Sequence, residues 1–384
     1  RCLMSSSFSV RCARSGLVIA TLLLPVLPVQ ALTFNFIADA GMDAQAYDAF
    51  VRAGNRWSSV FTDPVTVNLR IGYSALASGV LAQASSTQTI VPYTNFVSAL
   101  RADRTSSQDT TAVSNLSADL KFLTNRTSDS PNGPGSATPY LDNDGSFNNQ
   151  YLRMTSANAK ALGLMSATAT GTDATITFSN AFSYDFKPWD GIVAGTFDFT
   201  GLASHEIGHA LGFVSGVDIL DYYAGHGGPY GEDNFLLDPL DLFRYSVDSA
   251  ALGVADFTAD ARAKYLSLND GRTLLDSLST GVYYGDGRQD SHWKDNLGIG
   301  VMDPTAAAGE LLKFGEADLR ALDVVGWNRI SATGSAASAP GSAGIAGTAA
   351  VPANAVDVDA PAMLWLLGSG AILLFTRRRT AEAG

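Results

Sequence analysis

The residues best suited to chemistry lie in the run His205-Glu206-Ile207-Gly208-His209. On an α-helix, positions i and i+4 share a face, so His205 and His209 would present their imidazoles side by side. Two imidazoles in this arrangement suit a zinc ion. Glu206, one position round the helix, can reach a metal-activated water and take its proton. The run therefore predicts a zinc centre that activates water.

A helix must hold these side chains, and the surrounding residues favour one over residues 199–211. An apolar set recurs at i, i+3, i+4 and i+7, which predicts an amphipathic helix with one buried face, away from the histidines. Gly212 lets the backbone leave the helix sharply, because glycine tolerates positive φ. The apolar set is Ile207, Ala210, Leu211 and Val214.

Catalytic zinc sites usually have three protein ligands, so a third must come from elsewhere. Ser215 is a poor zinc ligand, and Asp218 is a weak candidate. Only two further histidines exist. His226 lies in a glycine-rich loop, where a solvated histidine is the simpler interpretation. His292 is the better candidate.

The context of His292 resembles that of one known peptidase family. The chain reads H-E-x-x-H-x-x-G-F from His205, then Ser-His-Trp around His292, then M-x-P-x-A-x-A-G from Met302. This combination resembles the leishmanolysin-type metzincin metallopeptidases, in which a long insertion precedes the third histidine. Here 82 residues separate His209 from His292. The resemblance is specific over residues 199–214 and 290–327 and weaker elsewhere.

The resemblance implies a role for each matching residue. His205, His209 and His292 would bind one catalytic Zn²⁺, Glu206 would be the general base, and Met302 would lie beneath the metal. The implied function is a secreted or surface-sorted zinc endopeptidase, which hydrolyses peptide bonds of extracellular proteins through a metal-activated water. Two alternatives stay open: an inactive metzincin-scaffold adhesion or binding protein, against which an intact Glu206 argues, and a zinc hydrolase acting on a non-peptide bond.

Both ends of the sequence are typical of processing signals. Residues 1–31 fit a signal peptide: Arg11 and Arg14 precede an apolar run, and Val29-Gln30-Ala31 suits a signal peptidase. Both cysteines lie in this segment, so the rest of the chain has neither disulfides nor thiolate ligands. Residues 330–358 are rich in Ala, Ser and Gly, which predicts a flexible linker.

Residues 359–384 predict a hydrophobic sorting tail or anchor. The apolar run 362–376 would span about 22 Å as a helix, short of a hydrocarbon core of about 30 Å, and an arginine cluster follows it. This pattern resembles the PEP-CTERM tails of Gram-negative bacteria, with Asp-Ala-Pro in place of Pro-Glu-Pro. The resemblance implies an exosortase-like sorting transpeptidase as partner, and a location outside the cell or at its surface. The alternative is a plain single-span anchor.

Composition limits the remaining possibilities. With 46% hydrophobic and 16% charged residues, residues 32–329 can form a catalytic domain with a substantial core. A formal net charge of −12 argues against nucleic-acid binding, because the phosphate backbone is also negatively charged. Asp142-Asn143-Asp144-Gly145 leaves room for a structural calcium ion, but it fails the EF-hand template, and a solvated turn is favoured.

The expected fold class is α+β, of the zincin/metzincin type: an N-terminal twisted sheet with helices, the active-site helix, and a mostly irregular C-terminal subdomain. Periodicity predicts a strand at 32–37, a helix at 44–61 and a strand at 65–73. Residues 85–120 are expected to be partly helical. Residues 174–179 predict a strand, which is either an edge strand that pairs with substrate or an internal one.

The segment 216–290 is expected to be the insertion. It contains two short predicted helices, at 238–245 and 259–265, and a closing helix follows at 316–325.

Overall fold

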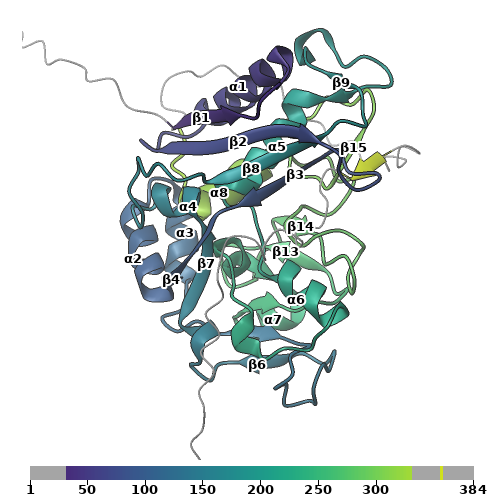
Figure 1. Ribbon diagram of the computed structural model, residues 1–384. Helices are drawn as coiled ribbons and strands as arrows, with labels where there is room; N and C mark the ends of the chain where they lie inside the picture. The colour runs from purple at the N-terminus through teal and green to yellow at the C-terminus, as the bar shows by residue number, and fades with distance from the viewer. Residues whose placement is uncertain (1–31, 331–354, 358–384) are drawn as a thin grey trace, which may run out of the picture.

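The computed structural model describes residues 32–330 and 355–357, which form an α+β fold. Its main sheet has four strands in the order β1-β2-β8-β3 (Figure 1). The first three strands run parallel, and β3 is antiparallel to β8. These strands are β1 (Thr33–Ala38), β2 (Thr66–Ser74), β8 (Ala174–Ser179) and β3 (Ala82–Ser86).

The predicted strand–helix–strand unit at the N-terminus is confirmed. Helix α1 (Ala44–Ser58) connects β1 to β2. It begins after Asp43, whose carboxylate accepts hydrogen bonds from the N–H groups of Gln45 and Ala46. This cap satisfies two of the N–H groups that every helix start leaves unpaired.

Helices α1 and α5 (Phe199–Leu211) pack beside each other and against the main sheet. Phe50 of α1 contacts both Phe178 of β8 and Phe199 of α5, with ring centroids 5.3 and 5.2 Å apart. Phe178 stacks on Phe199 at 4.1 Å. In Figure 1, α5 lies directly beneath the sheet. The sheet thus provides a rigid support for the helix that contains both motif histidines.

The remaining helices and strands surround this layer. The further helices are α2 (Tyr93–Asp103), α3 (Ser107–Asn115), α4 (Ser156–Ala161), α6 (Val217–Gly225), α7 (Val247–Leu252) and α8 (Glu316–Val324). Short 3₁₀ turns are η1 (Phe147–Asn149), η2 (Pro188–Asp190), η3 (Glu232–Asn234) and η4 (Pro239–Phe243). One cluster of buried apolar side chains extends from Leu32 to Trp327.

Small sheets complete the described fold. Strand β4 (Gln88–Pro92) pairs with β7 (Tyr151–Thr155), and β9 (Tyr184–Asp185) with β10 (Phe197–Asp198). Strand β5 (Phe122–Thr124) lies between β6 (Tyr140–Asp142) and β12 (Ala255–Phe257). Another three-stranded sheet has β13 (Lys264–Leu266) between β11 (Arg244–Tyr245) and β14 (Asp276–Leu278).

Two predictions for the insertion were wrong in detail. Residues 259–265 are not helical: they are a turn that leads into β13. Lys264 is buried there and forms an ion pair with Asp260, 2.8 Å away, so a polar residue occupies an inward position that periodicity assigns to apolar ones. Residues 238–245 form only the 3₁₀ turn η4 followed by β11.

The strand at 174–179 is internal, because β8 lies between β2 and β3. The edge position belongs to β3. Of the two alternatives left open by the sequence, the structure therefore selects the internal strand.

The predicted signal peptide at 1–31 and sorting tail at 359–384 lie outside the described residues. Within the predicted linker, β16 (Ala355–Asp357) pairs antiparallel with β15 (Thr305–Ala307). Among the described residues, no helix is both long and apolar enough to cross a membrane.

Candidate metal centre

Helix α5 has the bounds that the sequence predicts, and its ends show why. The Asp198 carboxylate accepts a hydrogen bond from Gly201 N–H at 2.9 Å, which caps the N-terminus. Gly212 follows the last turn with φ +117°, the left-handed conformation expected of a glycine there. The predicted apolar face is buried, and the face that carries the histidines is buried as well. On that face, His205 contacts the Val301 carbonyl and the His292 ring.

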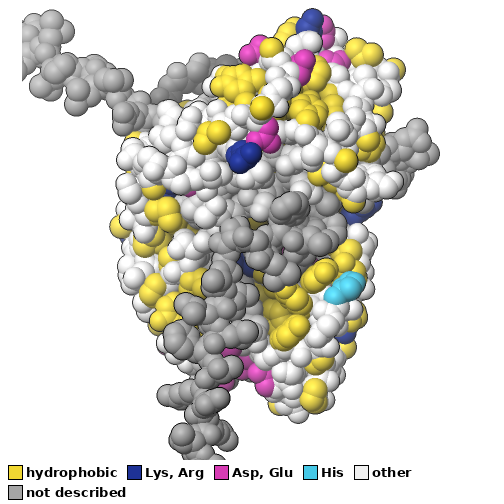
Figure 2. Space-filling view, in the orientation of Figure 1, with side chains coloured by type: hydrophobic (Ala, Val, Ile, Leu, Met, Phe, Trp, Pro, Cys, Tyr) yellow, Lys and Arg dark blue, Asp and Glu magenta, His cyan; other side chains and the backbone are white. Residues whose placement is uncertain are grey.

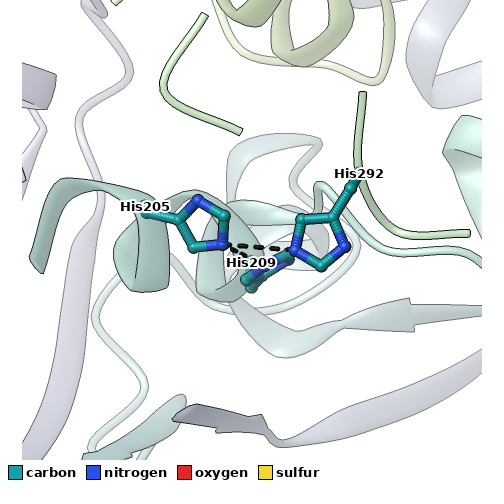
Figure 3. Close-up of side chains that lie close together, drawn as sticks. All are labelled: His205, His209 and His292. Carbon is teal, nitrogen blue, oxygen red and sulfur yellow. Dashed lines mark hydrogen bonds between the residues drawn. The ribbon is translucent and has the colours of Figure 1, made fainter. Parts of the chain in front are cut away.

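Three histidine rings meet on this covered face (Figure 3). His205 and His209 extend from α5, and His292 approaches from the distant segment. The His205 Nε2 atom lies 3.0 Å from His209 Nε2 and 3.3 Å from His292 Nε2. Ligand nitrogens of all three residues lie within 4.8 Å of one another. The three side chains are buried, with exposed fractions of 0%, 5% and 1%.

The other nitrogen of each ring faces a backbone carbonyl. His205 Nδ1 lies 2.7 Å from the Val301 oxygen, His209 Nδ1 lies 2.7 Å from the Phe213 oxygen, and His292 Nδ1 lies 3.3 Å from the Gln289 oxygen. A carbonyl oxygen only accepts hydrogen bonds, so each Nδ1 carries the proton. In a neutral imidazole, Nε2 is then a lone-pair donor. Three such lone pairs converge here, which is the arrangement of a metal site.

Glu206 lies next to His205 on α5 and is fully buried. Its carboxylate is therefore shielded from water, in surroundings where charged groups interact strongly. Glu206 is adjacent in the chain to one histidine of the cluster.

Met302 packs against the middle of α5. A Cβ atom added at Gly208 would lie 2.4 Å from Met302 Sδ, so this helix position accepts only glycine at the observed distance. Gly208 lies between His205 and His209 in the motif, and Met302 therefore supports the helix at the level of the two rings. Met302 is fully buried, as the resemblance implies.

Asp318, at the start of α8, is a residue that the sequence analysis did not identify. Its carboxylate accepts hydrogen bonds from Trp293 Nε1–H at 2.8 Å, Val301 N–H at 2.7 Å, Met302 N–H at 3.2 Å and Gly315 N–H at 2.8 Å. One buried side chain thus holds the residue after His292, the methionine turn and the α8 N-terminus together. Its place at the third position of a predicted helix is the one sequence signal that could have marked it.

The other candidates for the third ligand have different roles. His226 is exposed, and its ring stacks on Tyr222 with centroids 4.7 Å apart. One histidine is visible at the surface in Figure 2, and His226 is the exposed one of the four. The Ser215 hydroxyl donates to the Asp241 carboxylate, 2.5 Å away. Asp218 accepts hydrogen bonds from the N–H groups of Asp290 and Ser291, so it orients the segment that leads to His292.

Asp290 and Asp303, which lie close in the chain to His292 and Met302, have other partners. Asp290 forms a buried ion pair with Arg244. Burial raises the pKa of Asp290, and the Arg244 charge opposes that rise. Asp303 accepts hydrogen bonds from the N–H groups of Asn296 and Thr305. The Gln289 carbonyl provides the ring contact instead, a backbone group that side-chain chemistry in a sequence cannot indicate.

Comparison with known proteins found no matching family model, no similar curated protein and no similar solved structure. The functional assignment therefore depends on the chemistry of the residues themselves.

Proposed function

We propose that this protein is a zinc-dependent endopeptidase of the metzincin type. The observation that supports the proposal is the convergence of three imidazole nitrogens on one point, with Glu206 next to His205 on the same helix. Nitrogens that bind one zinc ion at about 2.0–2.1 Å are separated by roughly 3–3.5 Å, and the two Nε2 separations given by the structure fall in this range. Imidazole ligands alone, without thiolates, are typical of zinc sites that keep a position open for substrate or water.

Each residue of the site has a separate role in the proposed reaction. Zinc bound at the three histidines would supply a Lewis acid that polarises the scissile carbonyl and makes an attacking water more acidic. Glu206 takes the proton of that water and delivers it to the leaving amine. The carbonyls of Val301, Phe213 and Gln289 hold the imidazole rings in the tautomer that binds metal. Met302 packs against Gly208 of α5, and Asp318 holds the backbone of Met302 and the indole of Trp293. These two residues therefore hold the segment that contains His292 against the helix.

A peptide substrate is favoured by the position of β3. This strand is the outer strand of the main sheet in the described chain, and it runs antiparallel to β8. Ser86, at its end, donates a hydrogen bond to the His209 carbonyl at 3.4 Å. An extended peptide that paired with β3 would therefore run toward the histidines, which favours a peptidase over a hydrolase of another bond.

The decisive experiment combines zinc content with casein cleavage. We expect one zinc per chain and cleavage that stops when a chelator removes the metal and returns when zinc is restored. One bound zinc without cleavage of casein or of a peptide library would favour the binding protein or the non-peptide hydrolase. Absence of bound zinc would refute the proposal.

We also propose that the enzyme acts outside the cell on protein or peptide substrates, after export and recognition by an exosortase-like transpeptidase. The proposal rests on the residue pattern of segments 1–31 and 359–384. Mass spectrometry of protein from the native host should find an N-terminus near Leu32 and no residues beyond about Pro361. Retention of the arginine cluster 377–379 on exported protein would exclude the sorting tail.

A further inference from the structure

A second group of metal-ligand side chains lies apart from the three histidines. It consists of Asp142 at the end of β6, Asp144 in the following turn, and Glu232 at the start of η3. One carboxylate oxygen of each lies within 4.8 Å of those of the other two. Figure 1 shows β6 at the lower end of the molecule, and acidic side chains are visible in that region in Figure 2.

Asp142 is the residue that distinguishes this group from an ordinary acidic surface. The sequence favoured a solvated turn here, but the Asp142 side chain is only 2% exposed. Its Oδ2 atom accepts a hydrogen bond from Asn148 Nδ2 at 2.8 Å. Its Oδ1 atom is buried and accepts no hydrogen bond of normal length and angle, although the Asn149 amide and the Asp144 N–H lie near the carboxylate. A buried carboxylate oxygen without a donor is unfavourable unless a cation neutralises it.

The charges around Asp142, Asp144 and Glu232 also favour a bound cation. In the described chain, none of the three acids forms an ion pair with Lys or Arg, although ion pairs are frequent elsewhere. Burial raises the pKa of Asp142 to about 6; hydrogen bonds from the Asn148 and Asn149 side chains oppose this rise, and the nearby charge of Asp144 adds to it. Burial likewise raises the pKa of Glu232 to about 7, with Asp142, Asp129 and Asp144 adding to it. Protein alone therefore leaves excess negative charge here.

Neighbouring groups hold the acids in place. The Tyr140 hydroxyl donates to Glu232 Oε2 at 2.5 Å. Ser146 N–H donates to Asp144 Oδ1 at 2.7 Å, which fixes the turn. On the other side, Glu232 N–H donates to the Asp129 carboxylate at 3.1 Å. These contacts orient the carboxylates before any ion binds, which lowers the entropic cost of binding.

We propose that Asp142, Asp144 and Glu232 bind one Ca²⁺ ion. The donors are all oxygens, which select a hard cation over zinc. Three carboxylates from two separate segments suit the flexible coordination of Ca²⁺, whereas Mg²⁺ requires near-ideal octahedral geometry and usually takes one or two carboxylates. The ion joins the turn after β6 to η3, two segments that lie far apart in the sequence. Its role is therefore to stabilise the fold around the insertion.

The test uses the zinc-loaded full chain in buffer freed of divalent cations by a chelating resin, with zinc content measured before and after. Isothermal titration calorimetry with CaCl₂ should show one site. At 1 mM CaCl₂ the unfolding midpoint should rise by roughly 5 °C, because an ion that binds only the folded state stabilises it. MgCl₂ at the same concentration should give a smaller shift.

The Asp142→Asn variant provides the sharper test. The proposal predicts that the difference in unfolding temperature between the variant and the unmodified protein changes sign when calcium is added. Without calcium, the variant should unfold at the same temperature as the unmodified protein or higher, since one repelling charge is gone. With calcium, it should unfold at a lower temperature, since the ion no longer binds. Asp48→Asn, a change at an exposed acid on α1, should respond to calcium normally.

Three results would overturn the proposal. The first is no calorimetric signal and no calcium-dependent shift in the unmodified protein. The second is an equal loss of stability in Asp142→Asn with and without calcium, which indicates a purely structural hydrogen bond. The third is a larger shift with MgCl₂, which would exclude calcium as the ion.

Discussion

The two halves of the histidine site are held in different ways. His205, Glu206 and His209 belong to one helix, so their relative positions follow from the helical repeat. His292 and Met302 belong to a segment without a long helix or strand, which buried side chains and backbone carbonyls of other elements hold in place. We call these the helical half and the loop half. The helical half depends on local geometry, whereas the loop half depends on tertiary contacts.

Two consecutive hydrogen bonds join the helical half to the loop half. His205 Nδ1–H donates to the Val301 carbonyl, and Val301 N–H donates to Asp318. One ligand of the helical half is therefore oriented by the loop half. A change that loosens the loop should alter metal affinity even if both motif histidines remain.

The largest expected effect follows from breaking the loop half directly. His292→Ala removes one of the three proposed zinc ligands, so zinc stoichiometry should fall and casein cleavage should decrease by about 10³-fold or more. Elemental analysis and a casein assay measure both. His226→Ala is the matched control, because that histidine is exposed, and it should retain zinc and activity. A variant of His292 with normal zinc content would show that the loop half does not bind the metal.

In the helical half, Glu206→Gln keeps the shape of the side chain and removes the base. Activity should fall by about 10²-fold or more, while zinc content and unfolding midpoint remain close to normal. This variant separates chemistry from metal binding, which His292→Ala cannot do. Turnover equal to that of the unmodified protein would exclude Glu206 from the mechanism.

Asp318→Asn tests whether α8 positions the loop half. The amide presents an NH₂ group to backbone and indole N–H donors, so at least one contact is lost. We expect zinc affinity, measured by competition with a chromophoric chelator, to fall roughly 10–100-fold. Asp323→Asn is the matched control on the same helix. Equal zinc affinity in both variants would show that Asp318 contributes only to stability.

The smallest effect concerns the pH dependence of Asp323 itself. Burial raises its pKa to about 7, with the Asp109 charge adding to the rise and the Ser106 hydroxyl opposing it. An acid whose pKa is higher in the folded state favours folding at low pH, and this contribution is lost as pH rises from about 4 to about 7. Asp323→Asn should therefore be more stable than the unmodified protein at pH 8, by on the order of 2 kcal/mol.

At pH 4 the difference in free energy of unfolding should be much smaller, because Asp323 is protonated in the folded state and only about half ionised in the unfolded state. Denaturant titrations at the two pH values provide the measurement. A difference that stays constant between pH 4 and pH 8 would show that the ionisation of Asp323 does not control stability.

The sequence predicted most of the helical half. The spacing of His205 and His209, the capping acid and Gly212 are local features, and a helix responds to local features. The predicted bounds of α5 agree with the structure. The sequence did not predict that the face with the histidines is buried too, because an apolar stripe indicates only the face that must be buried.

The loop half could be predicted only through its residue types. The chain has few histidines, so His292 could be chosen, but nothing local fixes its position. The contacts that place it come from Asp218, Asp318 and the Gln289 carbonyl. Backbone carbonyls and buried aspartates have no periodicity, so pattern analysis does not detect them. The same limit explains the error at residues 259–265, where a buried ion pair decides the conformation.

Ribosomes make the chain from its N-terminus, so α5 and all three histidines exist before Asp318 does. A nascent chain that ends at residue 313 has every metal ligand but lacks α8. We expect such a chain to bind zinc weakly and to leave casein intact. The position of Asp318 near the end of the fold would then delay the proposed proteolytic activity until synthesis of the domain is nearly finished, and a cell that makes the protein would be protected from that activity during translation. Strong cleavage by the 32–313 fragment would contradict this expectation.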